Sequence, residues 1–141
     1  MILVLSITFS CIKVYGVVKK ALASQEETII RELSEIEKIK NYFYENLGNG
    51  VVFHKLWTVF ECESGWQQDI THTNYHKINS RCYPTSTDWG IAMINDCYWD
   101  ETAKAMGLDY KNNVYDNLLM AKYVYDVGGI TQWICYNNGY K

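Results

Sequence analysis

The chain has 141 residues, of which 48% are hydrophobic and 21% charged, so it can form one folded domain and is not intrinsically disordered. Its net charge is −3 and no basic face is visible, which argues against a nucleic-acid-binding protein. Pro84 is the only proline, which favours long helices over a turn-rich all-β fold.

The first 18 residues are mostly apolar, are broken by Lys13, and are followed by Ala21-Leu22-Ala23. An apolar stretch that ends in Ala-x-Ala is typical of a secretory signal peptide, with cleavage expected after Ala23. An uncleaved membrane anchor and a buried structural segment are the alternatives. We therefore expect residues 1–23 to be a signal peptide or membrane anchor, and the protein to be secreted, or periplasmic and attached to the cell envelope.

The cysteine count supports export. Removal of residues 1–23 discards Cys11 and leaves an even number of cysteines: Cys62, Cys82, Cys97 and Cys135. Four cysteines allow three disulfide pairings, and the sequence does not choose among them; buried free thiols are the alternative. The same removal takes away three lysines and no acidic residue, so the net charge falls from −3 to −6.

Helical periodicity begins after the leader. Residues 24–47 predict an amphipathic helix, with Ser24 and Glu27 as a capping box and Gly48-Asn49-Gly50 as its stop. Its predicted buried stripe consists of Ile29, Leu33, Ile36, Phe43 and Leu47. A second predicted helix runs from Val51 to Glu63 and ends at Gly65.

Residues 67–87 are polar and predict an irregular lobe or a short β-hairpin. Helical patterns return at 99–106, 114–127 and 130–136. The sequence therefore predicts a mainly α (α+β) protein, with a central irregular lobe between two helical blocks and one domain over residues 24–141.

Glu63 is the candidate catalytic residue. Cleavage of a glycosidic bond needs a carboxylic acid that keeps its proton near neutral pH. Glu63 ends an otherwise apolar helix, and both the apolar setting and the negative end of a helix favour the protonated form. Glu61 lies about 200° away around that helix and cannot face the same cleft. The alternative is that Glu63 is an ordinary solvated charge.

Three motifs occur in order: ESGW at residues 63–66, STDWGIAMIN at 86–95, and Trp133 with YNNG at 136–139. This ordered set resembles the lysozyme-like superfamily over residues 51–140. ESGW and Tyr-Asn-x-Gly resemble small soluble lytic transglycosylases, whereas Ser-Thr-Asp-Trp-Gly-Ile resembles animal-type lysozymes. The family's usual Gln is replaced by Met93, and Glu63 and Asp88 are 25 residues apart, farther than in a compact animal-type lobe.

The resemblance implies a lysozyme-like catalytic domain that cleaves the β-1,4 bond between N-acetylmuramic acid and N-acetylglucosamine in peptidoglycan. Glu63 would be the general acid and base, and Asp88 the second carboxylate of a lysozyme. The implied substrate contacts come from the motif residues Ser64, Trp66, Ser86, Trp89, Met93, Asn95, Trp133, Tyr136 and Asn137, with Trp66 and Trp89 as the expected cleft walls.

Two mechanisms follow. If Glu63 acts alone, the substrate's C6 hydroxyl attacks and the enzyme is a lytic transglycosylase, which the motifs favour. If Asp88 takes part, water is the acceptor and the enzyme is a hydrolytic muramidase. An inactive glycan-binding or envelope-assembly module is the non-enzyme alternative.

The remaining signals are weak. His72 and His76 with Cys82 suggest a metal site only faintly, and no phosphate-binding loop or Gly-x-Ser-x-Gly nucleophile motif occurs. We therefore expect no metal, no cofactor and no nucleic-acid partner. The expected partners are peptidoglycan glycan strands, with an envelope or secretion-apparatus protein as an alternative partner for residues 24–47, and the expected state is a monomer.

Overall fold

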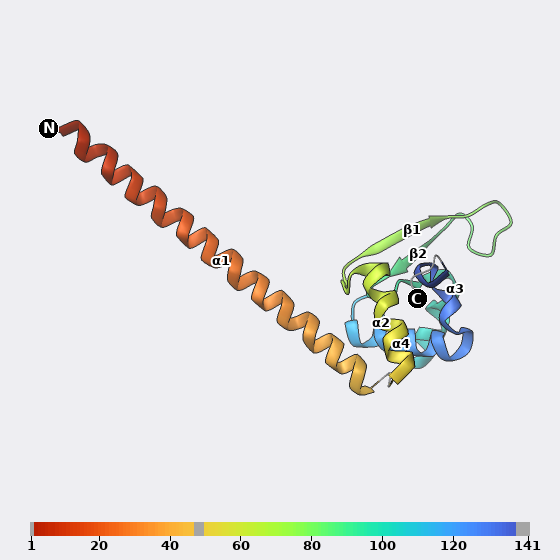
Figure 1. The fold of residues 1–141 in the computed structure, drawn as a ribbon. Coiled ribbons are helices and arrows are strands. Elements are labelled where there is room, and N and C mark those ends of the chain that lie inside the picture. Colours follow the sequence, from red (N-terminus) through yellow and green to blue (C-terminus); the bar gives the residue numbers. More distant parts are fainter. Residues whose placement is uncertain (1, 47–49, 138–141) are drawn as a thin grey trace. The chain divides into compact units, whose positions relative to one another are not determined.

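The computed structural model describes residues 2–46 and 50–137, and the side chains of residues 14–31, 34–46, 52–135 and 137 (Figure 1). The protein is mainly helical, with 66% helix and a small antiparallel sheet of three strands, as the sequence predicts. By its internal contacts the chain divides into two compact units, residues 1–38 and 39–141, which are described separately below.

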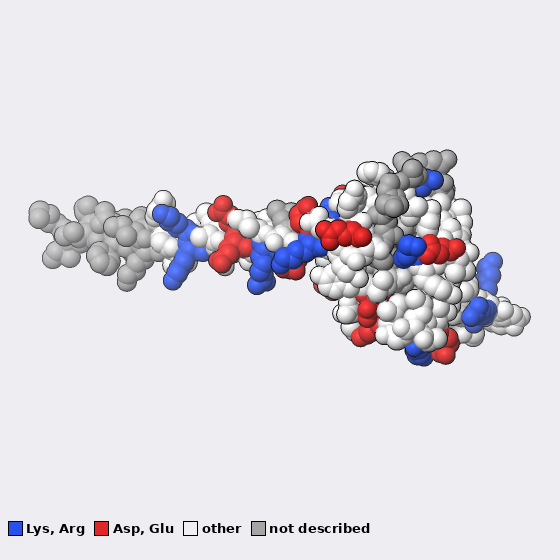
Figure 2. Space-filling view, turned by 90° about the horizontal axis from the view of Figure 1, so that it is seen from below, with Lys and Arg blue, Asp and Glu red and all other residues white. Residues whose placement is uncertain are grey.

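The first unit consists of most of helix α1, which spans Ile2–Asn46. The helix continues through Ser24, whose carbonyl oxygen accepts a hydrogen bond of 2.9 Å from the Thr28 hydroxyl, so the predicted helix start and capping box at Ser24 are wrong. Figure 2 shows both signs of charge along residues 14–38. Among the described residues, no helix contains an apolar stretch long enough to cross a bilayer.

The predicted buried stripe of residues 24–47 is correct only at its end. Ile29 is 56% exposed and Ile36 is half-buried, whereas Phe43 is completely buried. Leu33 and Leu47 lie outside the described side chains. Phe43 belongs to the second unit and packs its ring against those of Phe53 and Phe60, with ring centroids 5.4 and 5.5 Å apart.

Helix α2 spans Gly50–Ser64 and supplies much of this core. Its buried side chains recur at helical spacing: Phe53, Leu56, Val59 and Phe60. Glu63 follows at the end of the same helix and is half-buried. The apolar face of α2 therefore carries Glu63 to the edge of the core.

Strands β1 (Thr71–Tyr75), β2 (Thr85–Trp89) and β3 (Ile94–Asn95) form the sheet in that order, and β1 and β2 run side by side in Figure 1. His72 pairs with Asp88, Asn74 with Ser86, and Asp88 with Asn95. Because alternate residues of a strand point to one face, these side chains share a single polar face. The predicted short hairpin is thus part of this sheet.

The C-terminal helices are α3 (Asp96–Met106), α4 (Val114–Gly128), the 3-10 turn η1 (Ile130–Gln132) and α5 (Ile134–Asn137). Gly107 ends α3 in the left-handed conformation with φ 72°. Asn113 caps α4, and its side-chain oxygen accepts from the backbone N–H groups of Tyr115 and Asp116. Helix α4 buries Leu118, Met120, Ala121 and Val124 in the core.

Two disulfides link these elements. Cys62–Cys135 joins α2 to α5 across 73 residues, and Cys82–Cys97 joins the β1–β2 loop to the first turn of α3 across 15 residues. Loop closure of these lengths contributes about 4 and about 3 kcal/mol. Paired cysteines indicate an oxidising compartment, so the protein is suited to an extracellular or periplasmic location.

Side chains from three elements hold the turn between β2 and β3. Buried Asn117 donates to the carbonyls of Trp89 (2.9 Å) and Tyr110 (3.0 Å), and its oxygen accepts from the N–H of Ala92 (2.9 Å). The Ser64 hydroxyl donates to the Ile91 carbonyl at 2.7 Å. The Trp133 indole donates to the Ala92 carbonyl at 2.7 Å. These contacts fix residues 90–93 between α2, α4 and the chain that leads into α5.

Gly90→Ala should be strongly destabilising. At Gly90 φ is +72°, and a Cβ would lie 2.5 Å from Asn117 Nδ2 and 2.7 Å from Gln68 Oε1. We expect a loss of about 3 kcal/mol in the free energy of unfolding, measured by urea denaturation. Gly107→Ala is the matched control, because Gly107 has the same φ and no atom within 4 Å of such a Cβ. It should lose only about 1 kcal/mol. Equal losses would show that crowding around Gly90 is unimportant.

Candidate active site

A cavity of about 460 Å³ lies where α2, the sheet, α3, α4 and α5 meet, within the second unit. Its volume is in the usual range for a small-ligand site. Glu63 and Asp88 both line it. The other lining residues are Asn74, Arg81, Met93, Ile94, Asn95, Tyr98, Trp99, Val124, Gln132, Trp133 and Ile134.

Glu63 sits in an environment that favours its protonated form. Burial raises the pKa of Glu63 above 4.5, and the negative charge of Asp88 raises it further. Hydrogen bonds from the backbone N–H groups of Cys135 and Ile134 lower it in part, and the Cys135 bond to Oε1 is 2.8 Å long. The net pKa is raised, so the carboxyl keeps its proton to a higher pH than a free glutamate.

Glu61 differs from Glu63 in position. It is exposed and does not line the cavity. The two side chains leave α2 in different directions because two residues correspond to about 200° of rotation. The structure therefore places Glu63 in the cavity, which is the arrangement that the helical pattern predicts.

Asp88 is held by a network on the polar face of the sheet. Its two oxygens accept hydrogen bonds from the side-chain amides of Asn74 (2.8 Å) and Asn95 (2.6 Å), and its side chain is only 18% exposed. Asn95 also donates to the Ser86 hydroxyl at 2.9 Å. The oxygen of that hydroxyl lies 2.8 Å from His76 Nε2. The two amide donors therefore hold the Asp88 carboxylate in one orientation, at the cavity that Glu63 also lines.

Trp66 does not line the cavity, contrary to the sequence-based prediction. It is 3% exposed and packs against the rings of Phe43, Trp57 and Phe60. Gly65 and Trp66 both have positive φ, 60° and 64°, so the chain reverses after α2 and turns the indole into the core. Trp66 is therefore a core residue.

Two predicted serine contacts are also structural. Ser64 is buried, and its hydroxyl lies 3.1 Å from the carbonyl oxygen of Phe60 as well as 2.7 Å from that of Ile91. Ser86 is buried beneath Asn95 and His76. Neither residue lines the cavity, because both hydroxyls are occupied by protein partners. Ser64 thus holds the Ile91 backbone, and Ser86 contacts Asn95 and His76.

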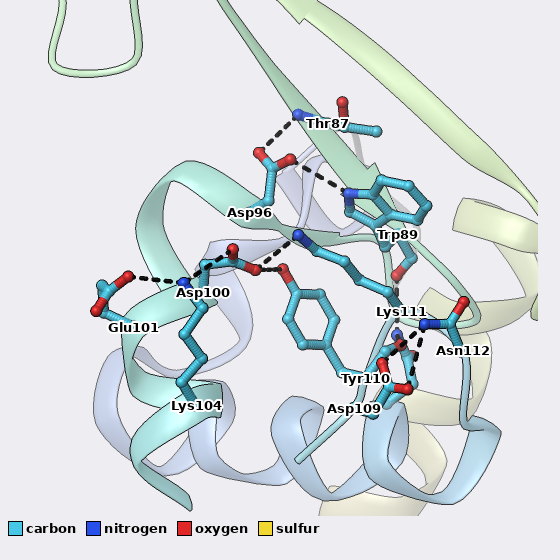
Figure 3. Close-up of polar contacts among 11 residues, drawn as sticks. Thr87, Trp89, Asp96, Asp100, Glu101, Lys104, Asp109, Tyr110, Lys111 and Asn112 are labelled. Carbon is cyan, nitrogen blue, oxygen red and sulfur yellow. Dashed lines mark hydrogen bonds and ion pairs between the residues drawn. The ribbon is translucent and has the colours of Figure 1, made fainter. Parts of the chain in front are cut away.

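Trp89 lies on the opposite side of the sheet from Asp88, because successive strand residues point to opposite faces. It borders a second hollow with Gln68, Asp69, Thr71, Lys111 and Asn112. Its indole N–H donates to Asp96 at 3.3 Å. Figure 3 shows Lys111 extended past Trp89 toward Asp100, with which it forms an ion pair of 2.8 Å. The prediction that Trp89 forms a wall of the catalytic cleft is therefore wrong.

The polar cluster in Figure 3 stabilises the structure. Burial alone would raise the pKa of Asp100, but hydrogen bonds from Lys111 and Tyr110 outweigh it and lower that pKa. Burial and the same carboxylate raise the pKa of Tyr110, whose hydroxyl donates to Asp100 at 2.9 Å. These contacts tie α3 to the loop before α4. Because each charge has a protein partner, the cluster is not a candidate for catalysis.

Three other predicted residues line the cavity: Met93, Asn95 and Trp133. The Oδ1 atom of Asn95 is buried and has no hydrogen-bond partner among the described residues. Asn137 is exposed, bonds to the Thr131 carbonyl and does not line the cavity. The side chain of Tyr136 lies outside the described residues.

The lining residues that sequence reasoning did not select include Asn74, Arg81, Tyr98 and Gln132. Strand alternation would place Asn74 beside Asp88 once the register of β1 and β2 is known. Arg81 and Tyr98 each adjoin a cysteine of the Cys82–Cys97 pair, and the pairing is what brings them together. The sequence carries no comparable signal for Gln132.

The histidines belong to the polar face of the sheet. His72 Nδ1 lies 3.9 Å from an oxygen of Asp88, and His76 contacts Ser86. Within the part of the chain that the structure describes, no group of three or more His, Cys, Asp or Glu side chains is placed to hold a metal ion.

Comparisons of the chain with protein-family models, with curated proteins and with solved structures find no match. The chemistry available to the cavity therefore follows from its own residues. A half-buried carboxyl with a raised pKa and a hydrogen-bonded carboxylate line the same space. Such a pair can protonate a leaving oxygen and stabilise positive charge at the carbon it leaves.

Asp88→Asn should lower the pKa of Glu63. The Asp88 charge raises that pKa, so its removal shifts Glu63 toward the ordinary value, and Glu63 loses its proton at lower pH than in the wild type. The shift is measured by NMR titration of the Glu63 carboxyl carbon. Asp126→Asn, at an exposed position of α4, is the control and should leave the titration unchanged. An unchanged Glu63 titration in Asp88→Asn would show that the two carboxyls are not coupled.

Proposed function

We propose that the protein cleaves the β-1,4 bond between N-acetylmuramic acid and N-acetylglucosamine in peptidoglycan, with Glu63 as the general acid. The observation that carries the proposal is the half-buried Glu63 carboxyl, which lines a cavity and has a pKa raised by burial. The ordered motifs that resemble the lysozyme-like superfamily support it, as do the mainly helical fold and small sheet.

Glu63 would donate its proton to the glycosidic oxygen as the bond from that oxygen to C1 breaks. Positive charge then develops at C1 of muramic acid. In hydrolysis, the Glu63 carboxylate next accepts a proton from water as water attacks C1, which yields a reducing end. In transglycosylation, the sugar's own C6 hydroxyl attacks and gives its proton to Glu63, which yields a 1,6-anhydro product.

The position of Asp88 favours the hydrolytic route. Its carboxylate lines the same cavity and carries the negative charge that would stabilise the charged sugar centre. Asn74 and Asn95 hold both of its oxygens, so little reorganisation is needed when the positive charge develops. A hydrolytic muramidase is therefore the function that the geometry supports best. A lytic transglycosylase is the second candidate, supported by ESGW and Tyr-Asn-x-Gly.

An oxidised, exported enzyme would meet this substrate outside the cytoplasmic membrane. The disulfides Cys62–Cys135 and Cys82–Cys97 suit that setting. An inactive glycan-binding module would not need a carboxyl with a raised pKa at its cavity, so the state of Glu63 favours an enzyme.

Glu63→Gln should abolish cleavage of purified peptidoglycan, measured as soluble products by liquid chromatography and mass spectrometry. Loss of a general acid predicts a rate about 100- to 10,000-fold lower. Glu61→Gln is the matched control on the same helix and should retain full activity. Activity of the wild type should fall as the pH rises through the raised pKa of Glu63, because the acid form is then lost.

The products of the wild type distinguish the two routes. Reducing ends indicate the muramidase, and anhydro-muropeptides indicate the transglycosylase.

Glu63→Gln should remain folded at neutral pH, because the raised pKa means that ionised Glu63 destabilises the folded state relative to its protonated form. Full activity in folded Glu63→Gln, or no product from folded wild type, would contradict the proposal.

A further inference from the structure

Arg81 differs in charge from the other residues of the cavity. Among the described residues that line it, Arg81 alone is basic, whereas Glu63 and Asp88 are acidic. The side chain is exposed and forms no ion pair with any carboxylate in the described part of the chain. Its guanidinium carbon lies 5.4 Å from the centroid of the Tyr98 ring. The cation therefore rests on an aromatic face at the cavity and can accept an anionic partner.

A disulfide keeps this arrangement in place. Cys82 follows Arg81, Cys97 precedes Tyr98, and the two cysteines are bonded with their Cα atoms 5.6 Å apart. The backbone N–H of Cys82 also donates to the Ser80 hydroxyl at 3.3 Å, which forms a local turn beside Arg81. The covalent link holds together the two backbone segments that carry Arg81 and Tyr98 before any ligand binds. Less conformational entropy is therefore lost when a ligand binds to Arg81.

The charges of the cavity are suited to a glycan that carries a carboxylate away from the bond that is cleaved. A ligand carboxylate next to the Asp88 carboxylate would be repelled, whereas a guanidinium binds one through two parallel hydrogen bonds. N-acetylmuramic acid differs from N-acetylglucosamine by a lactyl group on O3. That group ends in a carboxylate in peptide-free strands, and in a stem peptide with carboxylates of its own in substituted strands.

We propose that Arg81 binds a carboxylate on the O3 side chain of muramic acid and thereby selects peptidoglycan over uncharged N-acetylglucosamine polymers. This inference rests on the proposed function of the cavity. It makes Arg81 a specificity residue that contacts the substrate side chain, whereas Glu63 acts at the glycosidic oxygen. Recognition by Arg81 and bond cleavage by Glu63 would thus take place at two separate points of one cavity.

The test measures binding in a Glu63→Gln background, so that the ligands stay intact. Three tetrasaccharides are titrated by calorimetry: N-acetylglucosamine only, the peptide-free alternating sugar, and the same sugar with stem peptides. Arg81→Gln should weaken binding of a carboxylate-bearing ligand about 10- to 100-fold, as expected for loss of a charge-assisted hydrogen bond. Binding of the uncharged tetrasaccharide should not change. Arg81→Lys should recover part of the loss, because an ammonium keeps the charge but not the paired donors.

Lys77→Gln is the matched control, because it removes the same charge from the same loop at an exposed site outside the cavity. It should leave all three affinities unchanged. The ligand that loses affinity in Arg81→Gln shows whether the lactyl group or the stem peptide supplies the carboxylate. Equal affinity for all three ligands, unchanged by Arg81→Gln, would overturn the inference even if the wild type digests peptidoglycan. No binding and no digestion by folded protein would overturn the proposed function as well.

Discussion

The side-chain amide of Asn117 is the interaction on which the cavity depends. It is buried in α4 and makes three hydrogen bonds to backbone groups of residues 89, 92 and 110. Only glycine fits at position 90, because a Cβ there would collide with that amide. The turn between β2 and β3 sets the pairing of Asp88 with Asn95 and places Met93 at the cavity. Asn117, which is uncharged and fully buried, thus positions residues that line the cavity.

The same packing that stabilises the second unit also raises the pKa of Glu63. The buried face of α2 carries the carboxyl to the edge of the core, and Cys62–Cys135 fixes the backbone N–H that bonds to it. Burial opposes the charged form of the carboxyl, so the folded state loses some stability when Glu63 is ionised. The hydrogen bond from Cys135 limits that loss. Stability and acidity are therefore set by one environment.

The sheet separates the chemistry of its two faces. Asp88 joins Asn74 and Asn95 on the face that borders the cavity, whereas the next residue, Trp89, joins Asp96 and Lys111 on the other. This alternation explains how one short motif supplies both a candidate catalytic group and a structural one. The Cys82–Cys97 link then adds a cation to the cavity from a loop that would otherwise lie free of α3.

Local patterns in the sequence were enough to predict the helical blocks, the short hairpin, an even set of cysteines, and different directions for the Glu63 and Glu61 side chains, because these depend on spacing along the chain. The disulfide pairing and the positions of Trp66, Trp89 and Arg81 depend on the tertiary structure. Trp66 points into the core because Gly65 and Trp66 have positive φ, which no periodic pattern reveals. Arg81 reaches the cavity from a loop that is bonded to α3 through cysteines 15 residues apart. Contacts between distant segments decided which of the motif residues share one cavity, since spacing along a chain does not specify how its elements pack.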